Sequence, residues 1–370
     1  MGLRRLSWTY TGSTGDDRTY FTPPDRFYHV DHGGIPAPIV PETLTLQIAG
    51  QVARPRTFTY AELTDRLQRH GITRFVKCLQ CLRDPLGDDV EKRWYASSGL
   101  WGGLPLSVLL DEVGVLPGSK RIDYGGRDPS GFFASLPLER ALTPRDDLPI
   151  LLATELNGSP LTHCRGGPVR LLAPDLLGFK SIKWLSWLCV TDSCVPNGWY
   201  ERGRGVHLPP DQKDPTLKTI ARIAPVPDAS GHPTHPRLCT FQPGQPLMFR
   251  GYAVAGTRGL AGVRFRVGRG HGPGPHDTVT EGQALLEAPG SWGLPGPFPE
   301  GVTHFSGDRP QRWPLPAAWV YWQAWFGPLP SGRYHFEVWA VDLEGHEQPC
   351  PDPNEHSGSA MRENVAFHVG

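Results

Sequence analysis

The stretch Gly166-Gly-Pro-Val-Arg-Leu-Leu-Ala-Pro-Asp-Leu-Leu-Gly-Phe-Lys-Ser-Ile-Lys-Trp184 lies near the middle of a 370-residue chain. Val169–Leu172 predicts a strand, a Pro-Asp turn follows, and the loop Lys180–Lys183 adds two lysines and a serine. Together with Arg165 and Arg170, these cations crowd a segment rich in backbone N–H donors. That combination binds a phosphate and a polar heterocycle, so we interpret the stretch as a cofactor cradle.

A cysteine pair, Cys78 and Cys81, closes an apolar stretch upstream of this cradle. Either sulfur could supply a soft thiolate to a metal. The Cys-x-x-Cys spacing also suggests zinc binding or dithiol redox exchange, but no second pair stands at zinc spacing and no thioredoxin-like pattern surrounds it. A third interpretation is a buried, inert cysteine for either thiol alone. The pair and the cradle together indicate an enzyme rather than a scaffold.

Composition bounds the class of protein. The length favours two domains, each with its own core. The chain has 37 basic and 37 acidic side chains, so its charge balance gives no reason to expect nucleic-acid binding, and any anion site must be local. Its 44 glycines and 40 prolines lack a short period, which predicts many turns, long loops and little helix.

Targeting signals are also informative. The segment Met1–Tyr20 shows no apolar core of a signal peptide, and no apolar run long enough to span a membrane occurs in the sequence. Seven irregularly spaced cysteines suit reduced thiols better than a disulfide framework. We therefore expect a cytoplasmic protein without a membrane span, although an exported mature form would have the same pattern.

Residues up to about Asp192 mix helical and strand patterns, which predicts an α+β domain. A capping-box match over Thr59–Glu62 opens a helix that Gly71 ends. The other expected elements are strands over Leu44–Ile48, Ile72–Cys81 and Leu148–Leu156, a helix over Val108–Val113, and a hairpin turn at Asn157-Gly158.

From about Pro215 the helical periodicity disappears and short alternating strands recur between Gly and Pro turns. They are expected at Pro246–Val254, Gly262–Val267, Ala318–Phe326, Arg333–Asp342 and Asn364–Val369. This pattern predicts a β-sandwich, in which the aromatic run Trp319–Trp325 is a packed strand. We expect a catalytic domain over residues 1–214 and a sandwich domain over residues 215–370.

Several segments, in this order, resemble the sulfite oxidase family of molybdopterin-dependent oxidoreductases. They are Val76-Lys-Cys-Leu-Gln-Cys81, Trp101-Gly-Gly-Leu-Pro-Leu106, Glu155-Leu-Asn-Gly-Ser-Pro-Leu161, Gly167-Pro-Val-Arg170 and Lys180-Ser-Ile-Lys-Trp184. Each segment alone is a weak signal, but their common order and spacing are specific. The resemblance implies a mixed α/β catalytic domain followed by an immunoglobulin-like dimerisation domain.

The resemblance also implies a cofactor, Mo-molybdopterin, with molybdenum held by the dithiolene and one protein thiolate. Cys81 would be the metal ligand and the catalytic cysteine because it follows Gln80, and Cys78 is the rival. The expected cofactor-binding residues are His32, Cys81, Arg165, Arg170, Ser181 and Lys183. Sulfite-oxidising members carry an arginine where this chain has Val30, a tyrosine near Arg204 and an arginine near Gln323.

These departures remove positive charge that a sulfite pocket needs. We therefore expect two-electron redox or oxygen-atom transfer on a small substrate other than plain sulfite. The sequence has no haem or dinucleotide motif, so we expect an external electron carrier such as a cytochrome, with the chain as a homodimer. Two alternatives stay open: a true sulfite dehydrogenase with a rearranged anion pocket, and a cofactor-binding dimeric protein without turnover.

Overall fold

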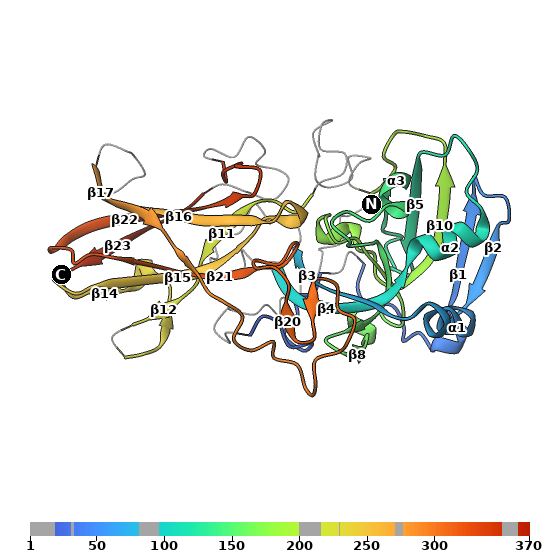
Figure 1. The fold of residues 1–370 in the computed structure, drawn as a ribbon, viewed down its shortest axis with the longest axis horizontal. Coiled ribbons are helices and arrows are strands. Elements are labelled where there is room, and N and C mark those ends of the chain that lie inside the picture. The colour runs from blue at the N-terminus through green and yellow to red at the C-terminus, as the bar shows by residue number, and fades with distance from the viewer. Residues whose placement is uncertain are drawn as a thin grey trace.

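The computed structural model describes residues 19–30, 33–80, 96–199, 216–228, 230–270, 277–349 and 362–370 of the chain. Within these ranges two bodies lie end to end, the first in blue to green and the second in yellow to red (Figure 1). We call them the first and second unit. Strands outnumber helices in both, in agreement with the low helix content that the many glycines and prolines predict.

The elements of the first unit follow one another with short connections. Its strands are β1 (Thr45–Gly50), β2 (Arg56–Thr59), β3 (Thr73–Gln80), β4 (Ala96–Pro105), β5 (Arg121–Gly126), β6 (Phe133–Pro137), β7 (Leu151–Leu156), β8 (Ser159–Pro160), β9 (Arg170–Leu172) and β10 (Leu185–Thr191). Its helices are α1 (Tyr60–His70), α2 (Leu106–Val113) and α3 (Leu138–Leu142), with 3-10 turns η1 (Pro41–Thr43), η3 (His163–Arg165) and η4 (Gly178–Lys180).

Helix α1 begins where the capping-box pattern predicts. The Glu62 backbone N–H donates to Thr59 Oγ1 at 3.3 Å, and the Thr59 N–H donates to Glu62 Oε2 at 2.8 Å. Gly71 ends the helix at φ 78°, a conformation that costs glycine little. The predicted turn at Asn157-Gly158 also forms and joins β7 to β8.

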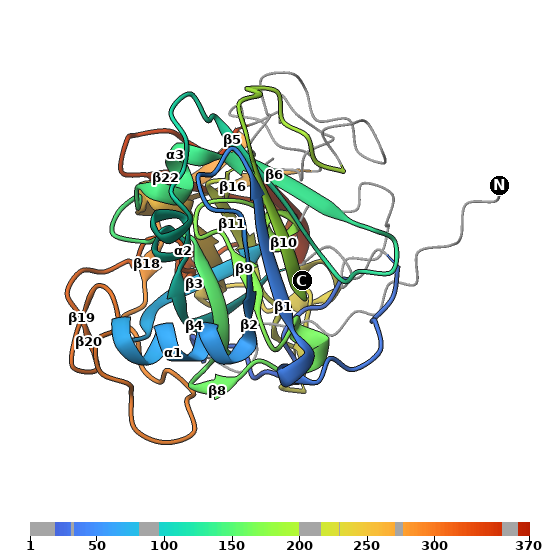
Figure 2. The same cartoon turned by 90° about the vertical axis from the view of Figure 1, so that its right-hand side faces the viewer.

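The first unit contains two sheets. One has the order β2-β1-β10-β5-β6 and is antiparallel except for the β1–β10 pair. The other has the order β3-β4-β7-β8, with β9 also paired to β7. Figure 2 looks onto this end of the molecule, where α1 and α2 lie beside the strands. Apolar side chains from both sheets and from the helices share one core.

The second unit is built almost entirely from strands. They are β11 (Ile220–Ile223), β12 (Val226–Pro227), β13 (Pro233–Thr234), β14 (Thr240–Phe241), β15 (Leu247–Val254), β16 (Leu260–Arg269), β17 (Thr278–Gln283), β18 (Leu285–Leu286), β19 (Phe305–Ser306), β20 (Arg309–Pro310), β21 (Val320–Phe326), β22 (Gly332–Asp342) and β23 (Glu363–Val369). Two 3-10 turns interrupt them, η5 (Pro236–Leu238) and η6 (Gly256–Arg258).

Two of its sheets, β11-β15-β21-β18 and β14-β23-β22-β16-β17, face one another across a shared core. Their alternating burial fits a sandwich, in which every second side chain points inward. Within the predicted aromatic strand, Trp322 is fully buried in this core and Trp325 is 59% exposed. The strand therefore forms as expected, with one of its tryptophans on the outer surface.

A third apolar cluster joins the two units, and an N-terminal segment runs through it. We call this segment, Thr19–Val30, the strap. Tyr20 and Phe21 of the strap pack there with Val76 and Cys78 of β3 and with Trp319 of the second unit. Further along, Phe27 and Tyr28 of the strap belong to the core of the first unit. The strap therefore contacts both units within about ten residues of chain.

Candidate active site

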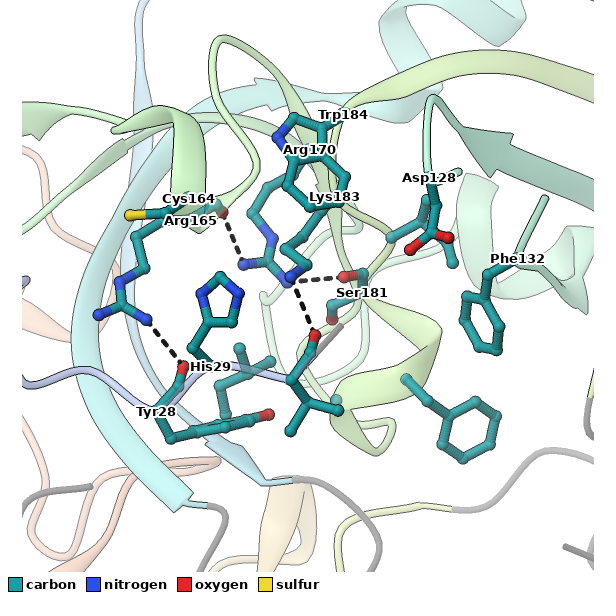
Figure 3. Close-up of a pocket in the computed structure, with 15 residues that line it drawn as sticks. Tyr28, His29, Asp128, Phe132, Cys164, Arg165, Arg170, Ser181, Lys183 and Trp184 are labelled. Atoms are coloured by element: carbon teal, nitrogen blue, oxygen red, sulfur yellow. Dashed lines mark hydrogen bonds between the residues drawn. The ribbon is translucent and has the colours of Figure 1, made fainter. Parts of the chain in front are cut away.

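A pocket in the first unit lies between the end of the strap and the loop Ala173–Trp184, which we call the pocket loop. It contains about 690 Å³ of empty space, including open solvent at its mouth. Its polar lining residues are Tyr28, His29, Asp128, Cys164, Arg165, Arg170, Ser181 and Lys183, and its other lining residues are Val30, Leu79, Phe132, Gly178, Phe179, Ile182 and Trp184. Figure 3 shows Arg170, Lys183 and Ser181 close together, with the guanidinium of Arg165 directed away from them.

Four of the residues predicted to bind a cofactor meet in this pocket: Arg165, Arg170, Ser181 and Lys183. They come from η3, β9 and the pocket loop. The other two candidates, His32 and Cys81, lie outside the described residues. The structure therefore brings the four described candidates into one cavity. Their contact with a cofactor remains a prediction.

The pocket loop is closed by hydrogen bonds at its base. The Leu171 N–H donates to the Ile182 carbonyl at 2.9 Å, and the Ala173 N–H donates to Ser181 Oγ at 3.2 Å. Gly166 has φ +95°, and a side chain there would collide with the aliphatic stem of Lys183. The backbone thus fixes Ser181 and Lys183 at the pocket wall before any ligand contact is considered.

Arg165 fastens the strap to the pocket. Its guanidinium donates to the carbonyls of Pro24 at 2.9 Å, Asp25 at 3.2 Å and Tyr28 at 3.2 Å. Because each of its three nitrogens donates to a strap carbonyl, Arg165 holds the strap against the pocket.

Arg170 is nearly fully buried behind the pocket wall. Its Nη1 donates to the Arg165 carbonyl at 2.9 Å and its Nη2 to the Ser181 carbonyl at 2.6 Å. Its Nε–H has no hydrogen-bond partner among the described residues. The pKa of Arg170 is lowered to about 10, chiefly by burial, while Tyr28 opposes the shift and Arg165 adds a smaller lowering effect. A buried cation with a spare donor suits an anionic or carbonyl-bearing ligand.

The two lysines of the pocket loop have different environments. Lys183 lines the pocket, where its Nζ donates to the Val30 carbonyl at 2.9 Å and lies 4.5 Å from the ring centre of Trp184. Lys180 is fully buried and turned away, with its Nζ donating to the Ser135 carbonyl at 2.6 Å. The interpretation of Lys180 as part of the cradle was therefore wrong. Its charge anchors the pocket loop to β6.

A third lysine, Lys77 on β3, holds the other end of the pocket loop. It is fully buried, and its Nζ donates to the carbonyls of Pro174 at 2.8 Å and Leu176 at 3.1 Å. Burial lowers its pKa to about 7, and nearby Asp175 partly offsets the shift. Asp175 itself accepts from Arg140 at 2.8 Å. Nothing in the sequence pattern indicated this buried charge network.

Cys78 lies on the face of β3 away from the pocket. Its side chain is fully buried in the cluster that joins the two units, whereas its neighbour Leu79 lines the pocket. Burial raises the pKa of the Cys78 thiol to about 12, with a smaller opposing effect of Lys77. Cys78 is therefore a buried thiol that does not line this pocket, and Cys81 as the metal ligand stays a prediction.

The sequence did not single out several pocket residues. Tyr28 and His29 reach the pocket from the strap, and Asp128 and Phe132 reach it from the connection between β5 and β6 (Figure 3). Asp128 begins an Asp-Pro-Ser-Gly turn, whose residue types were a visible turn signal. Its position opposite the cations depends on sheet pairing, which the local sequence does not encode.

The comparisons with known proteins address the same region. Residues 32–199 match the protein family described as "Oxidoreductase molybdopterin binding domain". The chain is 30% identical over 251 residues to the sulfite oxidase of Gallus gallus, covering 64% of this chain and 54% of that protein. It is 28% identical over 202 residues to inducible nitrate reductase [NADH] 2 of Glycine max, covering 50% of this chain and 22% of that protein.

Residues 32–199 therefore match a molybdopterin-binding oxidoreductase domain, and the chain is similar to members of the sulfite oxidase family. It spans about half the length of the first curated relatives that it matches, 54% for Gallus gallus and 43% for the mitochondrial sulfite oxidase of Drosophila melanogaster. Its fold is similar to that in the crystal structure of the sulfane dehydrogenase SoxCD from Paracoccus pantotrophus. The TM-score is 0.71 at 19% identity, with 100% of this chain and 90% of that chain covered.

The cofactor of a sulfite oxidase family protein is Mo-molybdopterin, and the described residues fit it. One buried polar atom of a residue that lines the pocket, Arg170 Nε, has no partner among the described residues and can serve a polar ligand. The pocket has room for more than a water molecule. Strand β3, which ends at Gln80, leads directly to the predicted ligand Cys81.

Proposed function

We propose that this protein is a molybdenum-molybdopterin oxidoreductase that carries out two-electron redox or oxygen-atom transfer on a small substrate other than plain sulfite. The observation that carries the proposal is the convergence of Arg165, Arg170, Ser181 and Lys183 on one pocket of the molybdopterin-binding domain. When bound, the cofactor supplies a metal that changes oxidation state by two electrons.

The side chains of the pocket would bind and orient rather than react. Lys183 and Ser181 would meet the polar parts of the pterin from the pocket loop, and Arg170 would place its spare Nε–H behind them. We propose Cys81 as the metal ligand, since a thiolate is a soft donor and Cys78 faces away. His32 stays a proposed cofactor contact.

Two features of the described residues argue against plain sulfite. Val30 lines the wall where the family resemblance predicts an arginine, and Leu79, Phe132 and Phe179 add apolar surface. Gln323, at the position expected to carry another arginine, lies on β21 of the second unit and donates to Glu287 at 2.7 Å. The cations that do line the pocket, Arg165, Arg170 and Lys183, are the ones proposed for the cofactor, so a doubly charged anion would lose hydration without further matching cations among the described residues.

The remaining assignments are proposals of the same kind. None of the helices in the described ranges is long and apolar enough to cross a membrane. We propose an external electron carrier such as a cytochrome, a homodimer, a cytoplasmic location, and an immunoglobulin-like second domain over residues 215–370 after a catalytic domain over residues 1–214. The Paracoccus pantotrophus protein SoxCD, named as a sulfane dehydrogenase, shares the fold.

The test starts with purified protein from a host that makes molybdopterin. About one molybdenum per chain is expected, and protein without molybdenum would contradict both the proposed function and its sulfite-oxidising alternative.

Sulfite-dependent reduction of ferricyanide is then compared with reduction of dimethyl sulfoxide and trimethylamine N-oxide by reduced methyl viologen. We expect no efficient sulfite oxidation. Rapid sulfite oxidation would instead establish a sulfite dehydrogenase with a rearranged anion pocket, and molybdenum without any turnover would favour a cofactor-binding protein.

A further inference from the structure

Asp175 is a buried carboxylate of the pocket loop that the proposed function does not use. Its side chain is 1% exposed. The Oδ2 atom accepts from Arg140 Nε at 2.8 Å and from Arg145 Nη1 at 3.2 Å, whereas Oδ1 has no hydrogen-bond partner among the described residues. A buried charge costs free energy unless it is paired, so these two arginines hold the carboxylate in place.

Both arginines belong to one region of the first unit. Arg140 is on α3, and it also donates to the Thr143 carbonyl at 3.1 Å and to the Leu148 carbonyl at 3.2 Å. These two carbonyls mark the ends of the loop Thr143–Leu148, which we call the bridging loop and which contains Arg145. The side chain of Asp175 is therefore fixed by the bridging loop and by the helix before it.

The second unit holds the bridging loop at the residue after Arg145. The segment between β18 and β21, residues 287–319, reaches the first unit beside β3 (Figure 1), where the Thr303 N–H donates to the Arg74 carbonyl at 2.7 Å. In this segment Arg312 pairs with the carboxylate of Asp146. His304 Nε2 lies 2.8 Å from the Asp146 carbonyl oxygen. One residue of the bridging loop thus contacts the second unit, and its neighbour contacts the pocket loop.

The backbone of Asp175 leads to the second unit as well. Its carbonyl accepts from the Leu217 N–H at 2.8 Å, and Leu217 is in the segment that runs into β11. A Cβ atom on Gly256, in η6 of the second unit, would lie 3.0 Å from the Leu217 carbonyl oxygen. The side chain and the backbone of Asp175 therefore connect to the same unit by separate routes.

The turn η4 connects Asp175 to the wall of the pocket. The Lys180 N–H donates to the Leu177 carbonyl at 2.9 Å, and the Ser181 N–H donates to the Gly178 carbonyl at 2.9 Å. Gly178 and Ser181 both line the pocket. A displacement of Asp175 would therefore carry pocket-lining residues with it.

We infer that Asp175 is a positioning residue, which ties the pocket loop to the second unit and so sets the position of Ser181 and Lys183. The second unit lines no part of the pocket within the described residues, and this tie lets it act on ligand binding there. The tie stands on the contacts of Asp175 alone. Its effect on molybdopterin rests on the proposed function.

The test measures hydrogen–deuterium exchange of the pocket loop in full-length protein by mass spectrometry. Arg312→Met removes the charge that pairs with Asp146 and Arg312→Lys keeps it, whereas Arg145→Met breaks the contact with Asp175. Arg264→Met is the matched control, because Arg264 is 46% exposed, as against 43% for Arg312, and pairs within the second unit. All four variants leave the buried Arg140–Asp175 pair intact, so they are expected to fold.

We expect exchange over residues 173–184 to accelerate about twofold or more in Arg312→Met and in Arg145→Met. Exchange in Arg312→Lys and in Arg264→Met should match the wild type. Unchanged exchange in Arg312→Met would overturn the inference, even if Arg145→Met had an effect, because the tie would then end within the first unit. Equal acceleration in Arg264→Met or in Arg312→Lys would also overturn it, since the paired charge would not be the cause.

A second measurement tests the positioning role. Each holoprotein is dialysed, and the molybdenum that remains per chain is followed over time. Arg312→Met and Arg145→Met should lose molybdenum faster than the wild type, and Arg312→Lys and Arg264→Met should not. Faster exchange with unchanged retention would reduce Asp175 to a structural role and contradict the inference. Wild-type protein without molybdenum would refute the proposed function itself, and the exchange measurement would still decide whether the tie exists.

Discussion

The environment of each residue in β3 depends on which face of the strand its side chain occupies. Along β3 the side chains alternate between two environments, so Val76 and Cys78 enter the cluster between the units while Phe75 and Leu79 face the core of the first unit. The Cys-x-x-Cys pattern alone could not distinguish its two sulfurs. The structure adds that Cys78 is buried between the units, while the choice of Cys81 as the metal ligand stays a prediction.

Replacing each cysteine should give opposite results. Cys81→Ser should abolish activity and change the Mo(V) electron paramagnetic resonance spectrum, because an oxygen ligand is harder than a thiolate. Cys78→Ala should leave the spectrum unchanged and destabilise the fold modestly, since it removes one buried sulfur. Molybdenum assay, spectroscopy and thermal unfolding of both variants check this. An unaltered spectrum in Cys81→Ser would show that Cys81 is not the metal ligand.

At the scale of an element, the pocket loop depends on a glycine that the sequence did not mark as special. Gly178 begins η4 and lies against Tyr28 Oη and the Gln80 carbonyl. Gly178→Ala should push the hydroxyl out of place and lower molybdenum content and turnover at least several-fold. Gly262→Ala is the control, because a Cβ there meets no atom within 4 Å. Equal cofactor content in both variants would show that this space is not needed.

The anchoring of the same loop by Lys77 predicts a pH dependence of stability. Its pKa in the folded protein is about 7, whereas a lysine in the unfolded chain stays protonated to about 10.4. From about pH 7 to 9 the unfolded state therefore binds more protons, and the free energy of unfolding should rise with pH. The slope is at most about 1.4 kcal/mol per pH unit for one group. Below pH 7 both states are protonated and this contribution to the slope vanishes.

Lys77→Met tests this argument, because it removes the titrating group and both hydrogen bonds to the pocket loop. The variant should be less stable throughout, and its stability should rise less than that of the wild type between pH 7 and 9. Urea unfolding of both proteins at several pH values measures the difference. Parallel curves for the two proteins would mean that Lys77 does not titrate in this range.

Local patterns predicted the elements better than the site. The capping box predicted the start of α1, and alternating residues predicted β15, β21 and β22. These signals succeed because periodicity and caps act over a few residues. The pocket needed contacts between distant segments. Lys180 and Lys183 look alike in sequence, yet only Lys183 lines the pocket. Lys180 ends η4 whereas Lys183 follows it, and no residue type signals the different directions of their side chains.

For the whole molecule, the strap is the connection that local sequence patterns could least predict. Phe21 is fully buried between the units, where its ring stacks on Trp292 at 5.3 Å, and Tyr28 further along lines the pocket. The second unit thus supports the pocket through the strap without lining it in the described residues. Damage at the junction should therefore reach the cofactor site.

Phe21→Ala should destabilise the protein by roughly 3–5 kcal/mol, the usual cost of deleting a buried aromatic ring. It should also lower molybdenum per chain, because Arg165 holds strap carbonyls that lose their fixed position. Phe336→Ala is the matched control, since Phe336 is equally buried but lies in the core of the second unit. Thermal unfolding should show similar losses for both, with molybdenum retained only in Phe336→Ala. Equal molybdenum loss would mean that general destabilisation, and not the strap, empties the pocket.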